Sequence, residues 1–165
     1  MNDNTPEVSS DAAFSAAENQ TAIGTVTATD ADGDLNDLSF SVSGTTLVIN
    51  SATGVLTFAT APDFETTTSV TATVTVSDGT NSSTQDITVT ITDVDDTAPV
   101  ITVTGDNPAT VELGATYTDA GATATDSDDA NPTVTSSGTV DADTLGTYTI
   151  TYTATDAAGN SSTAT

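Results

Sequence analysis

The chain has 165 residues and a formal charge of −24, because 24 Asp and Glu residues are present without any Lys, Arg or His. This composition excludes binding to nucleic acid and to anionic membrane surfaces, since no basic patch can neutralise phosphate. It also lacks the residues of nucleophilic triads, zinc sites and Schiff bases, and without Trp it offers little material for a sugar-stacking catalytic cleft. We therefore predict that the protein is not an enzyme.

Hydrophobic content is low, at 35%, and no Cys is available for disulfides. A disordered chain would have this composition, but here the apolar residues alternate with polar ones in long runs, as in half-buried β-strands. No apolar run approaches the roughly 18 residues of a membrane span, and no signal peptide opens the sequence. We expect a piece of a larger protein that does not insert into a membrane and is monomeric as a fragment.

The first part of the chain shows a series of short strand patterns rich in Val, Ile and Thr. An Ala-rich stretch at residues 11–19 is too short for a stable helix, so we expect an irregular strand there. Residues 50–53 carry the Asn and Ser that favour a turn. Strands are expected at residues 21–29, 38–42, 46–49, 54–58, 70–76 and 87–92. Such spacing is typical of a Greek-key sandwich with immunoglobulin-like architecture.

The second part of the chain repeats two patterns of the first part. Residues 27–32 are echoed by residues 123–128, and residues 76–84 are echoed by residues 154–163. The interval between these patterns is shorter in the second part. We therefore predict a smaller sandwich that lacks a strand or two and whose last strand is truncated.

Residues 93–99 form an acidic stretch between two β segments, with carboxylates at Asp93, Asp95 and Asp96 and a proline at Pro99. Two like charges about 4 Å apart cost roughly 1 kcal/mol in water and several times more at a lower dielectric. The chain has no basic side chain to offset them, and oxygen ligands favour Ca²⁺. We predict a calcium-binding linker that joins domains at residues 1–97 and 98–165.

The Asp-rich loop that begins at Asp30 resembles the start of an EF-hand only superficially. Asp30, Asp32 and Asp34 have the right spacing, but position six is Leu35 and position twelve is Ser41. The alternative is that these residues only cap turns. Their clustering at strand ends, without any basic residue, favours calcium.

Several motifs in residues 2–99, taken in order, resemble those of a cadherin repeat. They are the entering linker Asn2-Asp3-Asn4-Thr5-Pro6, Ala17-Glu18-Asn19 for the family's Pro-Glu-Asn, Asp30-Ala31-Asp32 with Asn36, Asp63-Phe64-Glu65, Asp78-Gly79 and the exit linker at residues 93–99. The second part, with Val111-Glu112-Leu113-Gly114, resembles the short immunoglobulin-like repeats of large bacterial surface adhesins of the RTX type. The fold we expect is all-β, with two tandem Greek-key immunoglobulin-like β-sandwiches.

This resemblance implies calcium ligands in three groups. The group at the entering pole of the first domain is Asn2, Asp3, Asn4, Asp30, Asp32, Asn36 and Asp78. The group at its exit pole is Glu18, Asp63, Glu65, Asp93, the Val94 carbonyl and Asp96. By the internal echo, the second domain adds Asp126, Asp128 and Asp156. Asp95 and Thr97 stand where the family linker prefers Asn, and we do not include them among the ligands.

The function we expect is that of structural extender modules in a bacterial cell-surface adhesin, in which Ca²⁺ rigidifies the linker. The protein is then extracellular, and its partners are neighbouring repeats of the same chain. One alternative is a directly adhesive module that binds a like partner or a carbohydrate. A second alternative is a halophilic acidic sandwich without specific metal sites, for which monovalent salt would replace calcium.

Overall fold

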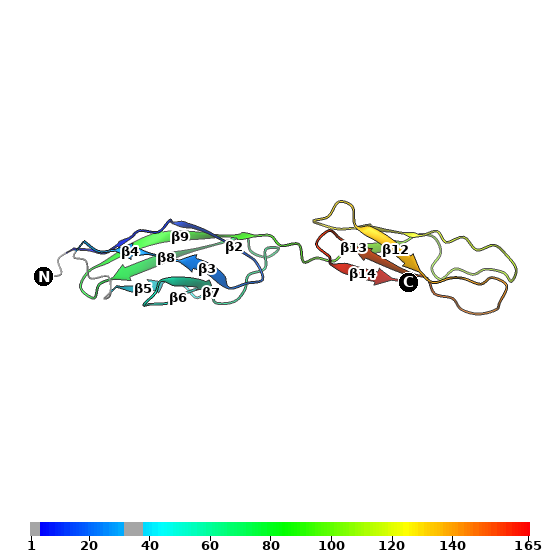
Figure 1. Cartoon of the computed structure of the whole chain (residues 1–165), viewed down its shortest axis with the longest axis horizontal. Coiled ribbons are helices and arrows are strands. Elements are labelled where there is room, and N and C mark those ends of the chain that lie inside the picture. Colours follow the sequence, from blue (N-terminus) through cyan, green and yellow to red (C-terminus); the bar gives the residue numbers. More distant parts are fainter. Residues whose placement is uncertain (1–3, 32–37) are drawn as a thin grey trace. The chain divides into compact units, whose positions relative to one another are not determined.

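A computed structural model describes residues 4–31 and 38–165, and within these ranges the chain forms strands and loops without a helix. The chain divides into two compact units, Met1–Val94 and Asp95–Thr165 (Figure 1). No described helix is long and apolar enough to cross a membrane. The all-β character predicted from the alternating pattern is confirmed.

The first unit is built from two facing sheets and a small two-stranded ladder. The larger sheet has the order β2-β9-β8-β5, the smaller sheet β3-β7-β6, and β1 pairs with β4. The strands are β1 (Glu7–Val8), β2 (Ala13–Ala17), β3 (Ala22–Thr25), β4 (Ala28–Thr29), β5 (Ser39–Val42), β6 (Leu47–Ile49), β7 (Val55–Phe58), β8 (Ser69–Ser77) and β9 (Ser82–Thr92). The Ala-rich segment is thus a strand, as expected, and it runs parallel to β9.

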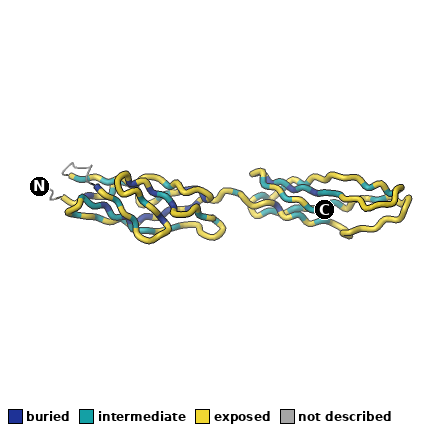
Figure 2. The backbone as a smooth tube through the Cα atoms, turned by 90° about the horizontal axis from the view of Figure 1, so that it is seen from below, coloured by how far each residue is buried: buried dark blue, intermediate teal, exposed yellow. Residues whose placement is uncertain are grey.

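The core of the first unit follows from the period of two along its strands. In β9, Ile87, Val89 and Ile91 are buried, whereas the Thr residues between them are exposed. Figure 2 shows how buried and exposed stretches alternate along the backbone. Successive side chains of a strand point to opposite faces, so one face of the sheet packs inward and the other meets water. Leu56 and Phe58 of β7 face the same core from the other sheet. This core fixes the strand ends that carry the acidic residues.

Within the smaller sheet, the β6–β7 turn lies close to the chain that follows β3, and the close approach is made at one glycine. Asn50 Oδ1 accepts the N–H groups of Ala52 and Thr53, each at 3.0 Å, which confirms the predicted turn. Gly54 follows with a φ of +69°, and its carbonyl accepts the Val26 N–H at 2.8 Å. A Cβ atom at Gly54 would lie 2.1 Å from the Val26 carbonyl oxygen, so the close approach requires glycine.

The second unit has a two-stranded and a three-stranded sheet. Its strands are β10 (Val100–Val103), β11 (Ala122–Thr125), β12 (Thr133–Ser137), β13 (Thr151–Thr155) and β14 (Ser161–Ala164), with pairs β10-β11 and β12-β13-β14. Residues 104–121 and 138–150 lie outside any strand. The buried hydrophobic side chains of this fully described unit are few, with Tyr152 and Ala154 in β13. Polar interactions therefore matter more to its stability than in the first unit.

Candidate metal centres

The first acidic cluster lies at the end of the parallel β2–β9 pair. The register places Ala17 opposite Thr92, and the Glu18 N–H donates to the Thr92 carbonyl at 3.1 Å. Because both strands end at the same edge of the sheet, the residues that follow them, Glu18 after β2 and Asp93 after β9, are held close together. The pairing of β2 with β9 thus brings together two motifs that are far apart in the sequence.

Glu18 is the structural anchor of this cluster, and its side chain is only 3% exposed. Glu18 Oε2 accepts the Phe64 N–H at 2.8 Å, and Glu18 Oε1 accepts the Val94 N–H at 2.9 Å. These bonds tie the loop that carries Glu65 and the chain after Asp93 to one carboxylate. Charged hydrogen bonds of this kind offset the cost of burying the group.

The carboxylate oxygens of Glu18, Glu65 and Asp93 all lie within 4.8 Å of one another. Two oxygens that each contact a calcium ion at about 2.4 Å are at most about 4.8 Å apart, and every pair in this group meets that limit. A backbone hydrogen bond lowers the pKa of Glu65, but a hydrogen bond with Asp63, desolvation and the charges of Glu18 and Asp63 outweigh it, and the net shift is upward. A cation would relieve this crowding.

The second acidic cluster belongs entirely to the second unit. Carboxylate oxygens of Asp95, Asp126 and Asp128 lie within 4.8 Å of one another. The antiparallel β10–β11 register pairs Val100 with Thr125, so the segment that enters β10 passes beside the loop that leaves β11. This strand pairing therefore brings Asp95 to the Asp-x-Asp loop.

Two carboxylate oxygens in this unit are buried without a hydrogen-bond partner. Asp126 Oδ1 accepts the N–H groups of Asp128 and Asp129, and Asp156 Oδ1 accepts those of Gly159 and Asn160. The second oxygen of each, Oδ2, has no partner among the described residues. An unsatisfied buried acceptor costs about 1–3 kcal/mol or more when charged. With no basic residue in the chain, these oxygens fit a cation.

The ionised side chains in and beside the second cluster are all carboxylates, but the pKa shifts of Asp95 and Asp156 have opposite directions. Desolvation raises the pKa of Asp95, and the charges of Asp156, Asp126 and Asp128 raise it further, whereas a hydrogen bond from the Thr97 N–H opposes the shift. For Asp156, burial would raise the pKa, but hydrogen bonds from Asn160 and from nearby backbone N–H groups hold it below its ordinary value. Like charges thus converge on a partly buried position, which suits a hard divalent cation.

The group predicted at the entering pole lies partly outside the described residues. Asn2, Asp3, Asp32 and Asn36 are outside them. Asp78 Oδ1 accepts the N–H groups of Thr80 and Asn81 at 2.6 Å each, and the Asn4 carbonyl accepts the Asn81 side-chain amide at 2.9 Å. Asp30 is half-buried after β4. The calcium role of this group stays a prediction.

The other predicted residues are distributed over the two clusters or beside them. Glu18, Glu65, Asp93, Asp126 and Asp128 are cluster members, Asp63 bonds to Glu65, and Asp156 acts on Asp95. Val94 contributes its N–H to Glu18, and among the described residues Asp96 belongs to neither three-carboxylate group. The sequence analysis missed Asp95. Its position inside the carboxylate run was the available signal, and it was set aside because the cadherin linker has Asn there.

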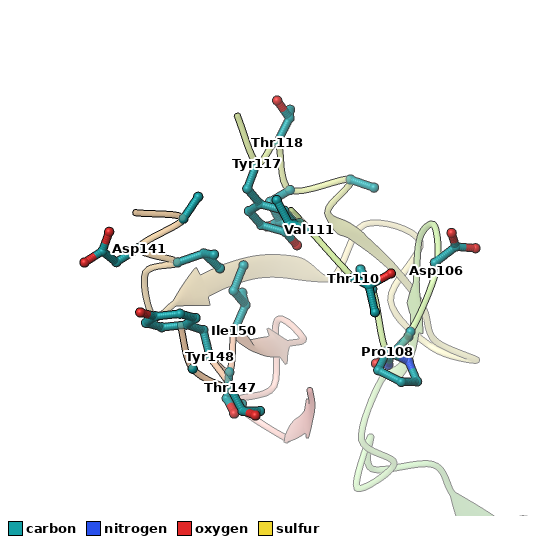
Figure 3. Close-up of a pocket in the computed structure, with 18 of the residues that line it drawn as sticks. Asp106, Pro108, Thr110, Val111, Tyr117, Thr118, Asp141, Thr147, Tyr148 and Ile150 are labelled. Atoms are coloured by element: carbon teal, nitrogen blue, oxygen red, sulfur yellow. The ribbon is translucent and has the colours of Figure 1, made fainter. Parts of the chain in front are cut away.

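The second unit also contains a pocket of about 680 Å³ between the two strandless segments. Tyr117, Val111 and Ile150 turn toward its middle, whereas the carboxylates of Asp106 and Asp141 point away (Figure 3). The inward side chains labelled in this view are therefore apolar or aromatic. The pocket is not a third carboxylate site.

Comparison with protein-family models gives two adjacent matches. Residues 12–92 match the model for the cadherin domain, and residues 101–165 match the model for the Ig-like domain of bacterial surface proteins. Their order confirms the resemblance inferred from the sequence. Both are non-enzymatic structural or adhesion-related folds of extracellular or surface proteins, which confirms that the chain is not an enzyme. Comparison with curated protein sequences gives no match.

Solved structures with a similar fold include cadherin ectodomains. Human protocadherin-24 EC1-2 is 21% identical over 94% of this chain and 88% of that chain, with a TM-score of 0.61. Its form II is 25% identical over 58% of this chain and 48% of that chain, with a TM-score of 0.52. Extracellular cadherin domains 3-6 of protocadherin gamma B2 are 22% identical over 99% of this chain and 50% of that chain, with a TM-score of 0.61. The predicted fold of tandem immunoglobulin-like β-sandwiches is confirmed.

Proposed function

From a cadherin domain at residues 12–92 followed by a bacterial surface Ig-like domain at residues 101–165, we propose a calcium-rigidified extender module of a bacterial surface adhesin. The observation that carries this proposal is the pair of three-carboxylate clusters, Glu18-Glu65-Asp93 and Asp95-Asp126-Asp128. Each cluster lies within one unit. Each also matches the ligand type and the spacing that calcium requires.

The two clusters contain linker residues that are separated in the chain only by Val94. A cation in the first cluster would fix Asp93 to the first unit, and a cation in the second would fix Asp95 to the second unit. The backbone freedom of the linker would then be confined to very few dihedral angles. A rigid linker lets a series of modules project another domain away from the cell surface.

The stabilisation expected from calcium is large for small domains. Extracellular modules bind calcium with dissociation constants of about 0.1–1 mM. At a free calcium concentration one hundred times the dissociation constant, each site adds about 2.7 kcal/mol to the free energy of unfolding. This amount is a substantial fraction of the free energy of unfolding of a small domain.

Thermal unfolding in calcium, in chelator, in magnesium and in matched sodium chloride tests the metal sites. We expect a calcium-selective rise of the midpoint that Asp126→Asn reduces. Asp141→Asn is the matched control, because Asp141 is exposed and its Oδ1 accepts only a local N–H, that of Asp143. Equal midpoints in calcium and in sodium chloride would instead support the halophilic alternative.

The rigidity of the linker needs a separate measurement. Because the chain has no Cys, the substitutions Ser51→Cys and Thr147→Cys place one spin label on each unit at exposed positions. We expect calcium to narrow the distribution of distances between the labels, as measured by electron–electron double resonance. If calcium raises the melting midpoint but leaves the width of the distance distribution unchanged, the metal sites stand and the rigid linker is contradicted.

A further inference from the structure

Each unit holds the segment that enters it with the same pair of side-chain hydrogen bonds. In the second unit, the Asn160 side-chain amide donates to the Asp95 carbonyl at 3.1 Å and to Asp95 Oδ1 at 3.2 Å. Two residues further on, Ser162 Oγ donates to the Pro99 carbonyl. Asn160 and Ser162 are both half-buried. We call these two residues the second-unit clamp.

The first unit repeats this arrangement on its own entering segment. The Asn81 side-chain amide donates to the Asn4 carbonyl at 2.9 Å, and Ser83 Oγ donates to the Pro6 carbonyl at 2.5 Å. The residues are the same in both units, because residues 81–84 and residues 160–163 both read Asn-Ser-Ser-Thr. In both units the Asn directly precedes a strand and the Ser is the second residue of that strand, and both side chains bond to the same entering segment.

A preceding loop fixes the Asn backbone in both units. The Asp78 N–H donates to the Asn81 carbonyl at 3.2 Å, and the Asp156 N–H donates to the Asn160 carbonyl at 3.1 Å. The Asn160 N–H in turn donates to Asp156 Oδ1 at 2.8 Å. The clamp is thus joined to the buried carboxylate of Asp156, whose charge acts on Asp95 of the second cluster. Units that match two different family models carry the same device.

We propose that Asn160 and Ser162 are positioning residues that hold Asp95 beside Asp126 and Asp128 before a cation binds, and so set the cation affinity of the second unit. This proposal rests on the proposed function. Without a cation, the three carboxylates repel one another and Asp95 is driven away from the loop. Both bonds that Asn160 makes to Asp95 oppose this movement, and the carboxylate is already in place when the cation arrives.

The test is a calcium titration of the full chain, monitored by nuclear magnetic resonance of the backbone amides. The resonances of each unit then give the dissociation constant of that unit separately. Partners that orient a metal ligand typically contribute about 10–100-fold to affinity. We expect Asn160→Ala to raise the dissociation constant of the second unit about tenfold and to leave that of the first unit within about twofold. Asn131→Ala is the matched control in the same unit, because the Asn131 side chain is exposed.

A second readout separates positioning from a general loss of structure. In chelator, we expect backbone relaxation to show residues 95–97 ordered in the wild type and mobile in Asn160→Ala, while β12–β14 keep their resonances. If Asn160→Ala does not fold, Ser162→Ala removes the other half of the clamp and should weaken binding about threefold.

Two outcomes would overturn the proposal. One is an unchanged dissociation constant in a folded Asn160→Ala protein, and the other is weaker binding without any gain of mobility at residues 95–97. A wild type that does not titrate with calcium would overturn the proposed function instead. The failure of the clamp and the failure of the metal site are therefore distinguishable.

Discussion

Tyr152 donates its phenolic hydrogen to the Asp119 carboxylate and so ties a strandless segment of the second unit to its central strand. Asp119 Oδ1 also accepts the Gly121 N–H at 3.0 Å. Tyr152 is 4% exposed and is one of the few buried apolar side chains in this unit. The bond lowers the pKa of Asp119 and, together with desolvation, raises the pKa of Tyr152 to about 12.

The stability of the second unit should therefore fall at alkaline pH. The folded-state pKa of Tyr152 is about 12 and its ordinary value is 10.0, so the contribution of this group is complete below pH 10 and is lost as the pH rises toward 12. All three Tyr residues belong to this unit, so near-ultraviolet circular dichroism during urea unfolding reports on it selectively.

Tyr152→Phe should remove most of this alkaline dependence. Tyr148→Phe is the control, because the Tyr148 hydroxyl donates to the Thr144 carbonyl in an exposed loop. Equal alkaline losses in Tyr152→Phe and in the wild type would contradict this assignment.

Asp95→Asn should have opposite effects in chelator and in calcium. Desolvation and the neighbouring carboxylates raise the pKa of Asp95, so its favourable contribution is present below about pH 3.8 and is lost as the pH rises through the folded-state value. At neutral pH its charge therefore destabilises the metal-free protein, and Asn at this position removes that repulsion. In calcium, the same substitution removes a ligand.

The measurement is the thermal midpoint of Asp95→Asn relative to the wild type in each condition. We expect a higher midpoint in chelator and a smaller calcium-induced rise. Asp106→Asn removes the same charge at an exposed position in the same unit and should change neither. A lower midpoint for Asp95→Asn in both conditions would show that its carboxylate is structural rather than a metal ligand.

The strands of the first unit were predictable from sequence because its apolar residues alternate. Ile87, Val89 and Ile91 are all buried, so the period of two reports the core face directly. The second unit gives a weaker signal, because residues 104–121 and 138–150 lie outside any strand. Local composition does not distinguish such chain from a strand, since pairing depends on distant partners.

The membership of the acidic clusters was only partly predictable for a related reason. Glu18, Glu65 and Asp93 follow from the order of motifs, and the parallel register of β2 and β9 explains why they meet. Asp95 lies in the same carboxylate run as Asp93, but only the β10–β11 register shows that it meets Asp126 and Asp128. The hydrogen bond from Asn160 to Asp95 spans 65 positions and likewise has no local signal.

Glu18→Ala should destabilise the first unit even without calcium. The substitution leaves the N–H groups of Phe64 and Val94 without their acceptor, because each bonds to one oxygen of this 3% exposed carboxylate. Two lost charged hydrogen bonds predict a loss of about 2–4 kcal/mol in the free energy of unfolding. Urea unfolding in chelator measures it, and Glu7→Ala, at an exposed strand position, is the control. A loss below about 1 kcal/mol would show that water replaces these bonds.

Gly54→Ala should destabilise the first unit far more than Gly44→Ala, although both glycines have positive φ values, of +69° and +80°. Each substitution places a side chain in the left-handed region, at a cost of about 1–2 kcal/mol. At Gly44 the new methyl group meets nothing within 4 Å, whereas at Gly54 it would lie 2.1 Å from the Val26 carbonyl oxygen. That overlap must also break or stretch the bond from the Val26 N–H to the Gly54 carbonyl. We therefore expect Gly54→Ala to cost at least about 2 kcal/mol more than Gly44→Ala in urea unfolding, and equal costs would show that the β6–β7 turn moves freely away from Val26.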